Sequence, residues 1–317
     1  MSGRPQFAAE TVESFLAEEY GFHGTLDTLP SERDQNFRVS VAGRPRYVVK
    51  IANAAEDADV VDLQHDAMAH LAAVGIGCPR PVEARDGHTI GTLEGHLFRV
   101  LTFLPGQLLA LRTDRSPALL TDFGSFLARL TKGFAGFDHP AAGRHIQWDV
   151  TLAAKVLSRY LPEVTADRQP LVERALHAFQ QHVEPLLDTL PRSVIHNDAN
   201  DHNVLVQEQR VTGLIDFGDM VRSLTLNELA VGCAYAGLGQ PDPWQVMELV
   251  ADGYDAVGQL SDVDRTLLPH LVRTRLATSV AISAHQQALA PHDAYLSISE
   301  APAWRALAAF DQRLEHR

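Results

Sequence analysis

The chain has 317 residues, 45% of them apolar and 21% charged, and a net charge of −13, so it has the length and composition of an ordinary globular protein with one large or two modest domains. The negative charge argues against nucleic acid or an anionic membrane as a partner, because both bind basic surfaces. Two cysteines, no signal-peptide core in the first residues and no apolar run of about 18 residues predict a cytoplasmic protein without disulfides or a transmembrane helix.

The first third of the chain predicts strands together with two helices. Phe37, Val39 and Val41 alternate with polar residues, which is the pattern of a half-buried strand, and a Gly-Arg-Pro turn follows them. Residues 57–74 place apolar side chains at helical spacing. The expected elements are helices over 7–20 and 57–74, and strands over 37–41, 47–51, 82–85, 88–93 and 96–103.

A Leu-Pro-Gly sequence at 104–106 ends the last of these strands, and the chain beyond it is mostly helical. We expect a domain boundary there, with residues 1–104 and 105–317 as the two parts. Asp149 is expected to cap the helix that follows it, with a role in substrate binding as the alternative. The expected helices cover 117–131, 148–160, 167–189, 225–237, 243–257, 263–290 and 302–314.

Residues 194–219, VIHNDANDHNVLVQEQRVTGLIDFGD, combine short apolar runs with polar loops. The runs at 204–206 and 211–215 predict a hairpin, and another strand is expected to end at Ile195. Two carboxylates and one amide therefore lie on loops that a small sheet holds, which is a usual arrangement at a functional site. These residues are Asp198, Asn203 and Asp216.

The spacing H-x-D-x4-N, followed by a hairpin and D-F-G-D, predicts phosphoryl transfer. Asp198 would orient the attacking hydroxyl, and an ordinary carboxylate pKa would suffice because a largely dissociative transfer needs no early proton removal. Asn203 and Asp216 would hold Mg²⁺, which prefers one or two carboxylates together with phosphate oxygens. Asp219 would brace the loop or bind a second metal, and His196 would hold the loop by hydrogen bonds.

The segments HNDANDHNVLV and GLIDFGDM resemble the aminoglycoside phosphotransferase and choline kinase family of small-molecule kinases, and within it most nearly the hydroxylysine kinases. This resemblance covers nearly the whole chain. It implies an α+β, bilobal protein-kinase-like fold with a small β-rich N-lobe for the nucleotide and a larger, mostly helical C-lobe for catalysis and substrate. It also implies ATP or GTP as the donor, Mg²⁺ as the metal, 5-hydroxylysine as the acceptor, and a functional link to an aminotransferase-like lyase.

The resemblance assigns the nucleotide phosphates to Lys50, which ends an apolar strand. An edge lysine whose stem packs on apolar neighbours is the alternative. Gln64 stands where kinases of this fold usually carry the glutamate partner of that lysine. A glutamine can accept a hydrogen bond but cannot neutralise the charge, so the flanking acids Asp62 and Asp66 are alternative partners.

The loop at 31–36 would cover the phosphates, and its sequence SERDQNF is also similar to hydroxylysine kinases. It lacks the glycines of a phosphate-binding cradle. Backbone N–H groups with Ser31 or Arg33 would therefore make the contacts, and a plain polar surface turn is the alternative.

Other interpretations stay open from the sequence. Homoserine, choline, ethanolamine or an aminoglycoside could be the acceptor in the same fold, and a nucleotide-binding pseudokinase would also account for Gln64. A metal-dependent hydrolase would use His196, Asp198 and His202 as ligands. Glu228 would either bind a substrate amine or interact with the dipole of its own helix.

Overall fold

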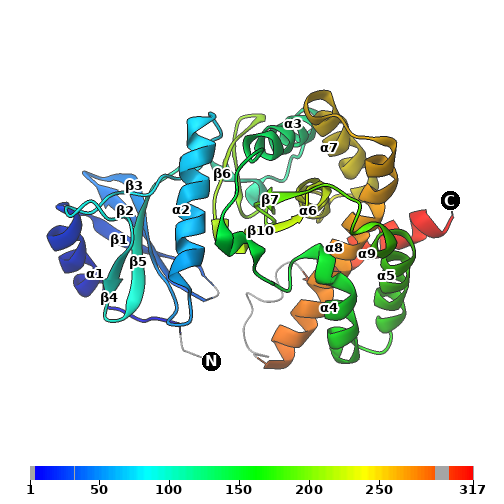
Figure 1. Cartoon of the computed structure of the whole chain (residues 1–317), viewed down its shortest axis with the longest axis horizontal. Helices are drawn as coiled ribbons and strands as arrows, with labels where there is room; N and C mark the ends of the chain where they lie inside the picture. Colours follow the sequence, from blue (N-terminus) through cyan, green and yellow to red (C-terminus); the bar gives the residue numbers. More distant parts are fainter. Residues whose placement is uncertain (1–3, 32, 290–299, 317) are drawn as a thin grey trace. The chain divides into compact units, whose positions relative to one another are not determined.

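The computed structural model describes residues 4–31, 33–289 and 300–316, and it shows two compact units divided between Pro105 and Gly106 (Figure 1). Glu32 of the predicted phosphate-covering loop and residue 290, the predicted end of a helix, lie outside the described residues. The first unit is rich in strands and the second is mostly helical, as the sequence predicts. The functional roles assigned to the two parts stay predictions.

The first unit is built on an antiparallel sheet in the order β1-β2-β3-β5-β4. The tight turn between β2 and β3 uses Ala42 and Gly43, both with positive φ, which suits a two-residue hairpin. The strands are β1 (Thr25–Leu29), β2 (Gln35–Val41), β3 (Arg44–Ile51), β4 (Gly91–Leu93) and β5 (His96–Thr102).

Two helices flank this sheet, α1 (Ala9–Phe15), which continues as a π-helix over Leu16–Tyr20, and α2 (Ala58–Ala73) (Figure 1). Successive residues of a strand point to opposite faces, so Val49 and Ile51 join the buried cluster beneath α1 while Lys50 points to the other face. The sheet thus turns an apolar face toward α1, while its other face carries the polar row of Asn36, Lys50 and Arg99.

Two local predictions in this unit were wrong, and one strand was missed. No strand forms over 82–85, because the preceding segment carries Pro79 and Pro81, and only Pro81 makes an isolated bridge to β5. Strand β1 is present although its sequence, TLDTL, gave no clear pattern. Strand β2 begins at Gln35, so the last two residues of the predicted 31–36 loop belong to a strand.

The second unit packs its helices around α8, which contacts α4, α5, α6 and α9. The helix predicted over 167–189 ends at His182, because Pro185 cannot continue it. In the described part of the chain, no helix is long and apolar enough to cross a membrane. The helices are α3 (Pro117–Gly133), α4 (Ala153–Tyr160), α5 (Gln169–His182), α6 (Leu226–Ala236), α7 (Pro243–Gly258), α8 (Asp262–Leu289) and α9 (Glu300–Glu315).

Helices α3 and α7 meet through two glycines. A Cβ atom added at Gly124 would lie 1.8 Å from the Val250 carbonyl oxygen, and one added at Gly253 would lie 1.9 Å from the Thr121 carbonyl oxygen. The Ser125 hydroxyl also donates to the Gly253 carbonyl at 2.9 Å. The two backbones therefore touch directly, at a separation that a side chain of any size would prevent.

Two small sheets, where the sequence suggested one, hold the polar loops. The hairpin of β8 (Val204–Gln207) and β9 (Arg210–Leu214) forms as predicted and gains β6 (Gln107–Leu108). Strand β7 (Arg192–Ile195) pairs instead with β10 (Val221–Leu224), which the sequence analysis missed.

Candidate active site

Residues 196–203, here called the 196–203 loop, connect β7 to β8, and the turn at 216–219 follows β9. The N–H of Ile215 donates to the carbonyl of Asn203 at 2.9 Å, which joins the end of the loop to the start of the turn. Asn197 and Asp216 have φ angles of 64° and 62°, in the left-handed region that costs a non-glycine residue about 1–3 kcal/mol. Strained backbone of this kind clusters at functional sites.

The carboxylate of Asp198 is held by two amide side chains of its own loop. Asn203 Nδ2 donates to Asp198 Oδ2 at 2.6 Å and to its main-chain carbonyl at 3.0 Å, and Asn200 Nδ2 donates to Oδ1 at 2.8 Å. The side chain of Asp198 is 20% exposed, so it remains reachable from solvent. The loop thus fixes the direction of a carboxylate without covering it.

The predicted metal ligands have the donor atoms that Mg²⁺ prefers. Asn203 uses Nδ2 for its hydrogen bonds to Asp198, so these bonds do not occupy its carbonyl oxygen Oδ1. Burial and the negative charge of Asp219 raise the pKa of Asp198 well above its usual range, with a further contribution from Asp216. The structure thus departs from the ordinary pKa expected from the sequence, and the mutual repulsion of these carboxylates fits a cation held among them.

His196 braces the loop through its ring. Its side chain is fully buried, and its Nδ1 accepts the N–H of Asp198 at 3.2 Å. Burial lowers the pKa of His196 to about 4, so the ring is neutral near neutral pH. The ring packs edge-on against Phe217 of the turn, with 4.7 Å between the centroids. This agrees with the predicted structural role of His196 in holding the loop.

The N-terminus of α6 anchors one end of the 196–203 loop. Glu228, which is fully buried, accepts the N–H of His196 at 2.6 Å. Asn227 Nδ2 donates to Asn197 Oδ1 at 2.9 Å, and Asn197 Nδ2 donates to the carbonyl of Asp219 at 3.2 Å. With no exposed surface, Glu228 is a loop anchor, and the substrate-amine role considered from the sequence finds no support in its position.

The C-terminus of α6 anchors the other end of the loop through one arginine. Arg115 Nη2 ion-pairs with Asp201 at 2.7 Å, and Arg115 Nη1 donates to the carbonyls of Tyr235 and Ala236 at 3.1 and 2.7 Å. A cation at this end of a helix is also favoured by the helix dipole. Both ends of α6 therefore hold the same loop.

Glu228 makes the stability of the protein depend on pH. Burial raises its pKa from 4.5 to about 7, although the N–H groups of His196 and Asn197 and the charge of Arg275 oppose this in part. The folded protein therefore holds the proton more tightly than the unfolded chain. The resulting stabilisation is complete below about pH 4.5 and is lost as pH rises through 7, about 3 kcal/mol in all.

We expect Glu228→Gln, which keeps an acceptor for the His196 N–H, to remove this dependence. Urea unfolding of both proteins at pH 5 and pH 8 checks it. Relative to the variant, the wild type should lose about 2–3 kcal/mol of unfolding free energy between these pH values. A constant difference between the two proteins would contradict the assignment.

Two arginines contact this site although they lie outside the sequence motif that predicts it. Arg144 donates from Nε to the carbonyl of Met220 at 2.9 Å and from Nη2 to that of Gly218, so it fixes the turn at 216–219. Arg275 Nη2 lies 3.5 Å from Asp198 Oδ1. Arg275 sits in a stretch of α8 that is otherwise buried and largely apolar, and a charge in such a stretch is the sequence feature that could have predicted a buried partner.

Asp149 serves as a cap, as the sequence favours. Its carboxylate accepts the N–H of Thr151 at 3.0 Å and the Thr151 hydroxyl at 2.7 Å, at the start of the 3-10 helix Val150–Leu152. The Ser223 hydroxyl of β10 donates to the same carboxylate at 2.5 Å. Only 5% of the surface of Asp149 is exposed, and its carboxylate is used by these hydrogen bonds. A role in substrate binding is therefore not supported.

In the first unit, Lys50 lies in a polar row across three strands, with Asn36 of β2 and Arg99 of β5 as its register partners. Gln64 Oε1 of α2 accepts a hydrogen bond from Arg99 Nη2 at 2.9 Å, and both side chains are buried. Gln64 therefore hydrogen-bonds the arginine that neighbours Lys50 in the sheet. A direct contact between Gln64 and Lys50 stays a prediction.

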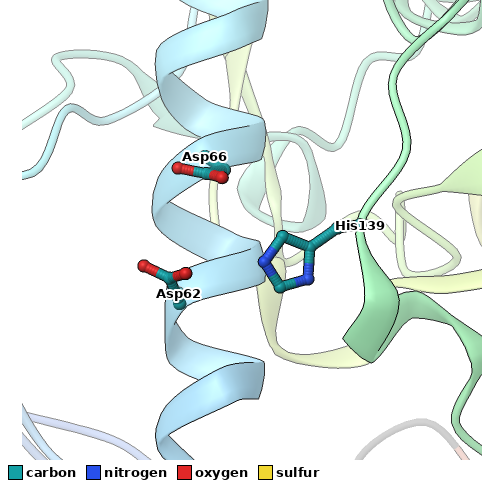
Figure 2. Close-up of side chains that lie close together, drawn as sticks. All are labelled: Asp62, Asp66 and His139. Carbon is teal, nitrogen blue, oxygen red and sulfur yellow. The ribbon is translucent and has the colours of Figure 1, made fainter.

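Asp62 and Asp66, the alternative partners of Lys50, lie one turn apart on α2 and are both exposed (Figure 2). Residues of a helix four positions apart share a face, and the figure shows both carboxylates on the same side of α2. Gln64 between them is turned into the protein. The two acids therefore present a charged helix face, in contrast to the buried glutamine.

The described residues between β1 and β2 make several side-chain contacts. Ser31 Oγ accepts the N–H of Asp34 at 3.2 Å, and Asp34 Oδ1 accepts the N–H of Asn53 at 3.1 Å. Gln35 bonds both the N–H and the carbonyl of Phe7, at 2.7 and 2.9 Å. Arg33 is exposed, so it is accessible to a ligand. Phosphate contacts by Ser31 and Arg33 stay a prediction.

Comparison with known sequences identifies a family and two similar proteins. The model of the phosphotransferase enzyme family (APH) matches residues 25–267. The hydroxylysine kinase of Mus musculus is 27% identical, over 96% of this chain and 90% of that protein. The homoserine kinase of Gluconobacter oxydans is 29% identical, over 84% of each chain.

Solved structures share the fold. An amicoumacin kinase in complex with AMP-PNP, Ca²⁺ and amicoumacin superposes with a TM-score of 0.72, at 16% identity, over 97% of this chain and 94% of that one. A microcompartment-associated aminopropanol kinase superposes with a TM-score of 0.71, at 17% identity, over 92% of this chain and 93% of that one. The predicted α+β, protein-kinase-like fold is confirmed.

Proposed function

This chain belongs to the phosphotransferase enzyme family and phosphorylates an alcohol group, and we propose that its acceptor is 5-hydroxylysine and its donor ATP or GTP. The observation that carries the proposal is the fixed but accessible carboxylate of Asp198, held by Asn203 and Asn200. The match to hydroxylysine kinases over nearly the full length of both chains supports the choice of acceptor.

In the proposed reaction, Asp198 accepts a hydrogen bond from the acceptor hydroxyl and directs its oxygen toward the γ-phosphorus. The O–P bond to the acceptor forms as the bond between the γ-phosphorus and the β–γ bridging oxygen breaks, and the hydroxyl proton passes to Asp198 late in the transfer. Orientation is the main contribution, because in-line placement of two reactants lowers the entropic part of the barrier.

We propose that Asn203 and Asp216 bind Mg²⁺, with Asp219 as a further ligand or brace. When bound, the cation neutralises charge on the phosphates of the nucleotide. The amide of Asn203 joins the two functions, since it donates to Asp198 through Nδ2 and offers Oδ1 to the metal. Arg144 keeps the turn that carries Asp216 and Asp219 in place through two main-chain carbonyls.

We propose that the first unit contributes Lys50 as the phosphate-binding cation, with Ser31, Arg33 and the backbone of their loop. Gln64 takes part indirectly in this proposal. It orients Arg99, which neighbours Lys50 in the sheet, so the lysine works beside a second fixed positive charge. Two neighbouring cations suit a ligand that carries several negative charges.

The test is release of nucleoside diphosphate with Mg²⁺, using ATP and GTP separately, against 5-hydroxylysine, homoserine, choline, ethanolamine and kanamycin. We expect kcat/KM for 5-hydroxylysine to exceed that for the other acceptors by at least about tenfold. A preference for homoserine would replace 5-hydroxylysine as the proposed acceptor, in line with the similarity to homoserine kinases. Nucleotide binding without turnover on any acceptor would contradict the proposal and favour a pseudokinase.

A further inference from the structure

Arg275 of α8 is held in one orientation by residues of two segments that are distant in sequence, Trp148 and Tyr235. Its guanidinium lies over the ring of Trp148, 4.7 Å from the centroid, and over that of Tyr235, at 5.4 Å. Its Nη1 donates to the carbonyl of Trp148 at 3.0 Å. Only 4% of the side chain is exposed. A planar cation stacked on aromatic rings loses little further freedom when it meets an anion.

The anion that it meets is the carboxylate of Asp198, with 3.5 Å between Nη2 and Oδ1. The other side chains that bond this carboxylate, Asn200 and Asn203, are neutral, so among the described residues Arg275 supplies the positive charge in contact with it. At 3.5 Å the contact is longer than a strong charge-assisted hydrogen bond. It can therefore balance the charge and set the direction of the carboxylate while leaving Oδ1 able to accept the acceptor hydroxyl.

Arg273, two residues earlier on α8, shows what a purely structural arginine looks like in this fold. It is equally buried, at 2% exposure, and its Nη1 pairs with Asp311 of α9 at 3.3 Å. Residues two positions apart on a helix face different sides, so the partners of the two arginines are separate. The same helix thus offers a matched control for burial and charge.

We propose that Arg275 is a positioning residue for the phosphoryl transfer, which acts by fixing and charge-balancing Asp198. This rests on the proposed function, in which Asp198 orients the acceptor hydroxyl. Without the guanidinium, the carboxylate keeps its two amide partners but loses the charge that offsets its like-charged neighbours. The consequence falls on turnover rather than on binding of either substrate.

The experiment compares Arg275→Met with Arg275→Gln, whose side chain is polar but uncharged, and with Arg273→Met. For both Arg275 variants we expect kcat to fall by on the order of 100-fold, with KM for nucleotide and acceptor within about threefold of wild type. Arg273→Met should lower thermal stability and leave kcat per folded molecule within about twofold. Circular dichroism and active-site-independent unfolding curves give the folded fraction of each variant.

Chemical rescue separates a missing charge from a damaged fold. In Arg275→Ala, the gap between the two aromatic rings suits a free guanidinium ion, and millimolar guanidinium should restore part of kcat. The same ion should not restore Asp198→Asn.

The outcomes distinguish this inference from the proposed function. If wild type turns over no acceptor, or Asp198→Asn turns over normally, the proposed function fails. If turnover depends on Asp198 but the folded Arg275 variants keep wild-type kcat, only the positioning role is overturned. A rise in KM confined to acceptors that carry a carboxylate, with kcat unchanged, would also overturn it and assign Arg275 to substrate binding.

Discussion

Asp198→Asn is expected to lower kcat by about 1,000-fold while changing nucleotide affinity by no more than a few-fold. Asparagine keeps the shape of the side chain, so the loop can remain folded. However, Asn203 and Asn200 donate to opposite oxygens of Asp198, and an amide offers an acceptor to only one of them. The other partner would face an N–H group, and neither arrangement leaves a carboxylate for the acceptor hydroxyl.

Diphosphate release at saturating nucleotide gives kcat, and calorimetry gives the nucleotide affinity. The control is Asp27→Asn, which removes an exposed carboxylate from a surface ion pair with Arg38 and should leave both quantities unchanged. Substantial turnover by Asp198→Asn would remove Asp198 from the mechanism and with it the proposed geometry of transfer.

Gly124→Ala is expected to destabilise the second unit by at least about 3 kcal/mol. On helix propensity alone the change should stabilise α3 by about 1 kcal/mol, because alanine is the better helix former. The new Cβ would, however, lie 1.8 Å from the carbonyl oxygen of Val250, a backbone atom that cannot move aside alone. Relief requires α3 and α7 to separate along their whole contact, so the steric term outweighs the propensity.

Urea unfolding followed by intrinsic tryptophan fluorescence, to which Trp244 on α7 contributes, measures this effect. Gly143→Ala is the matched control, since a Cβ there meets nothing within 4 Å and should change the unfolding free energy by less than about 0.5 kcal/mol. Equal stability of the two variants would show that α3 and α7 are not held at the separation seen here.

The polar loops were predictable because the residues that act together are close in sequence. His196, Asp198, Asn203 and Asp216 lie within one strand–loop–hairpin–turn segment, and their order constrains both structure and chemistry. The hairpin of β8 and β9 followed from two β-branched runs with a turn between them. Positive φ at Asp216, in contrast, is imposed by the surrounding fold and leaves no mark on composition.

The supports of these loops could not be predicted in the same way. Arg115, Arg144 and Arg275 reach the site from segments far away in sequence. The apolar surroundings of Arg275 in α8 indicate burial, but they do not identify the loop as its partner. Strands β6 and β10 are short and form only because β8 and β7 are present as partners. These arginine contacts and short strands depend on the tertiary structure, and the local sequence pattern carries little information about them.

Because α6 holds the 196–203 loop at both of its ends, the loop and the helix should open as one cooperative unit. Releasing the loop means breaking the contacts of Glu228 and Asn227 at one end and the Arg115–Asp201 pair at the other, all of them buried. Local fluctuations of the kind that fray surface loops are therefore suppressed here. The backbone amide of His196, which bonds the buried Glu228, should therefore exchange with solvent about as slowly as the amides of the helix core.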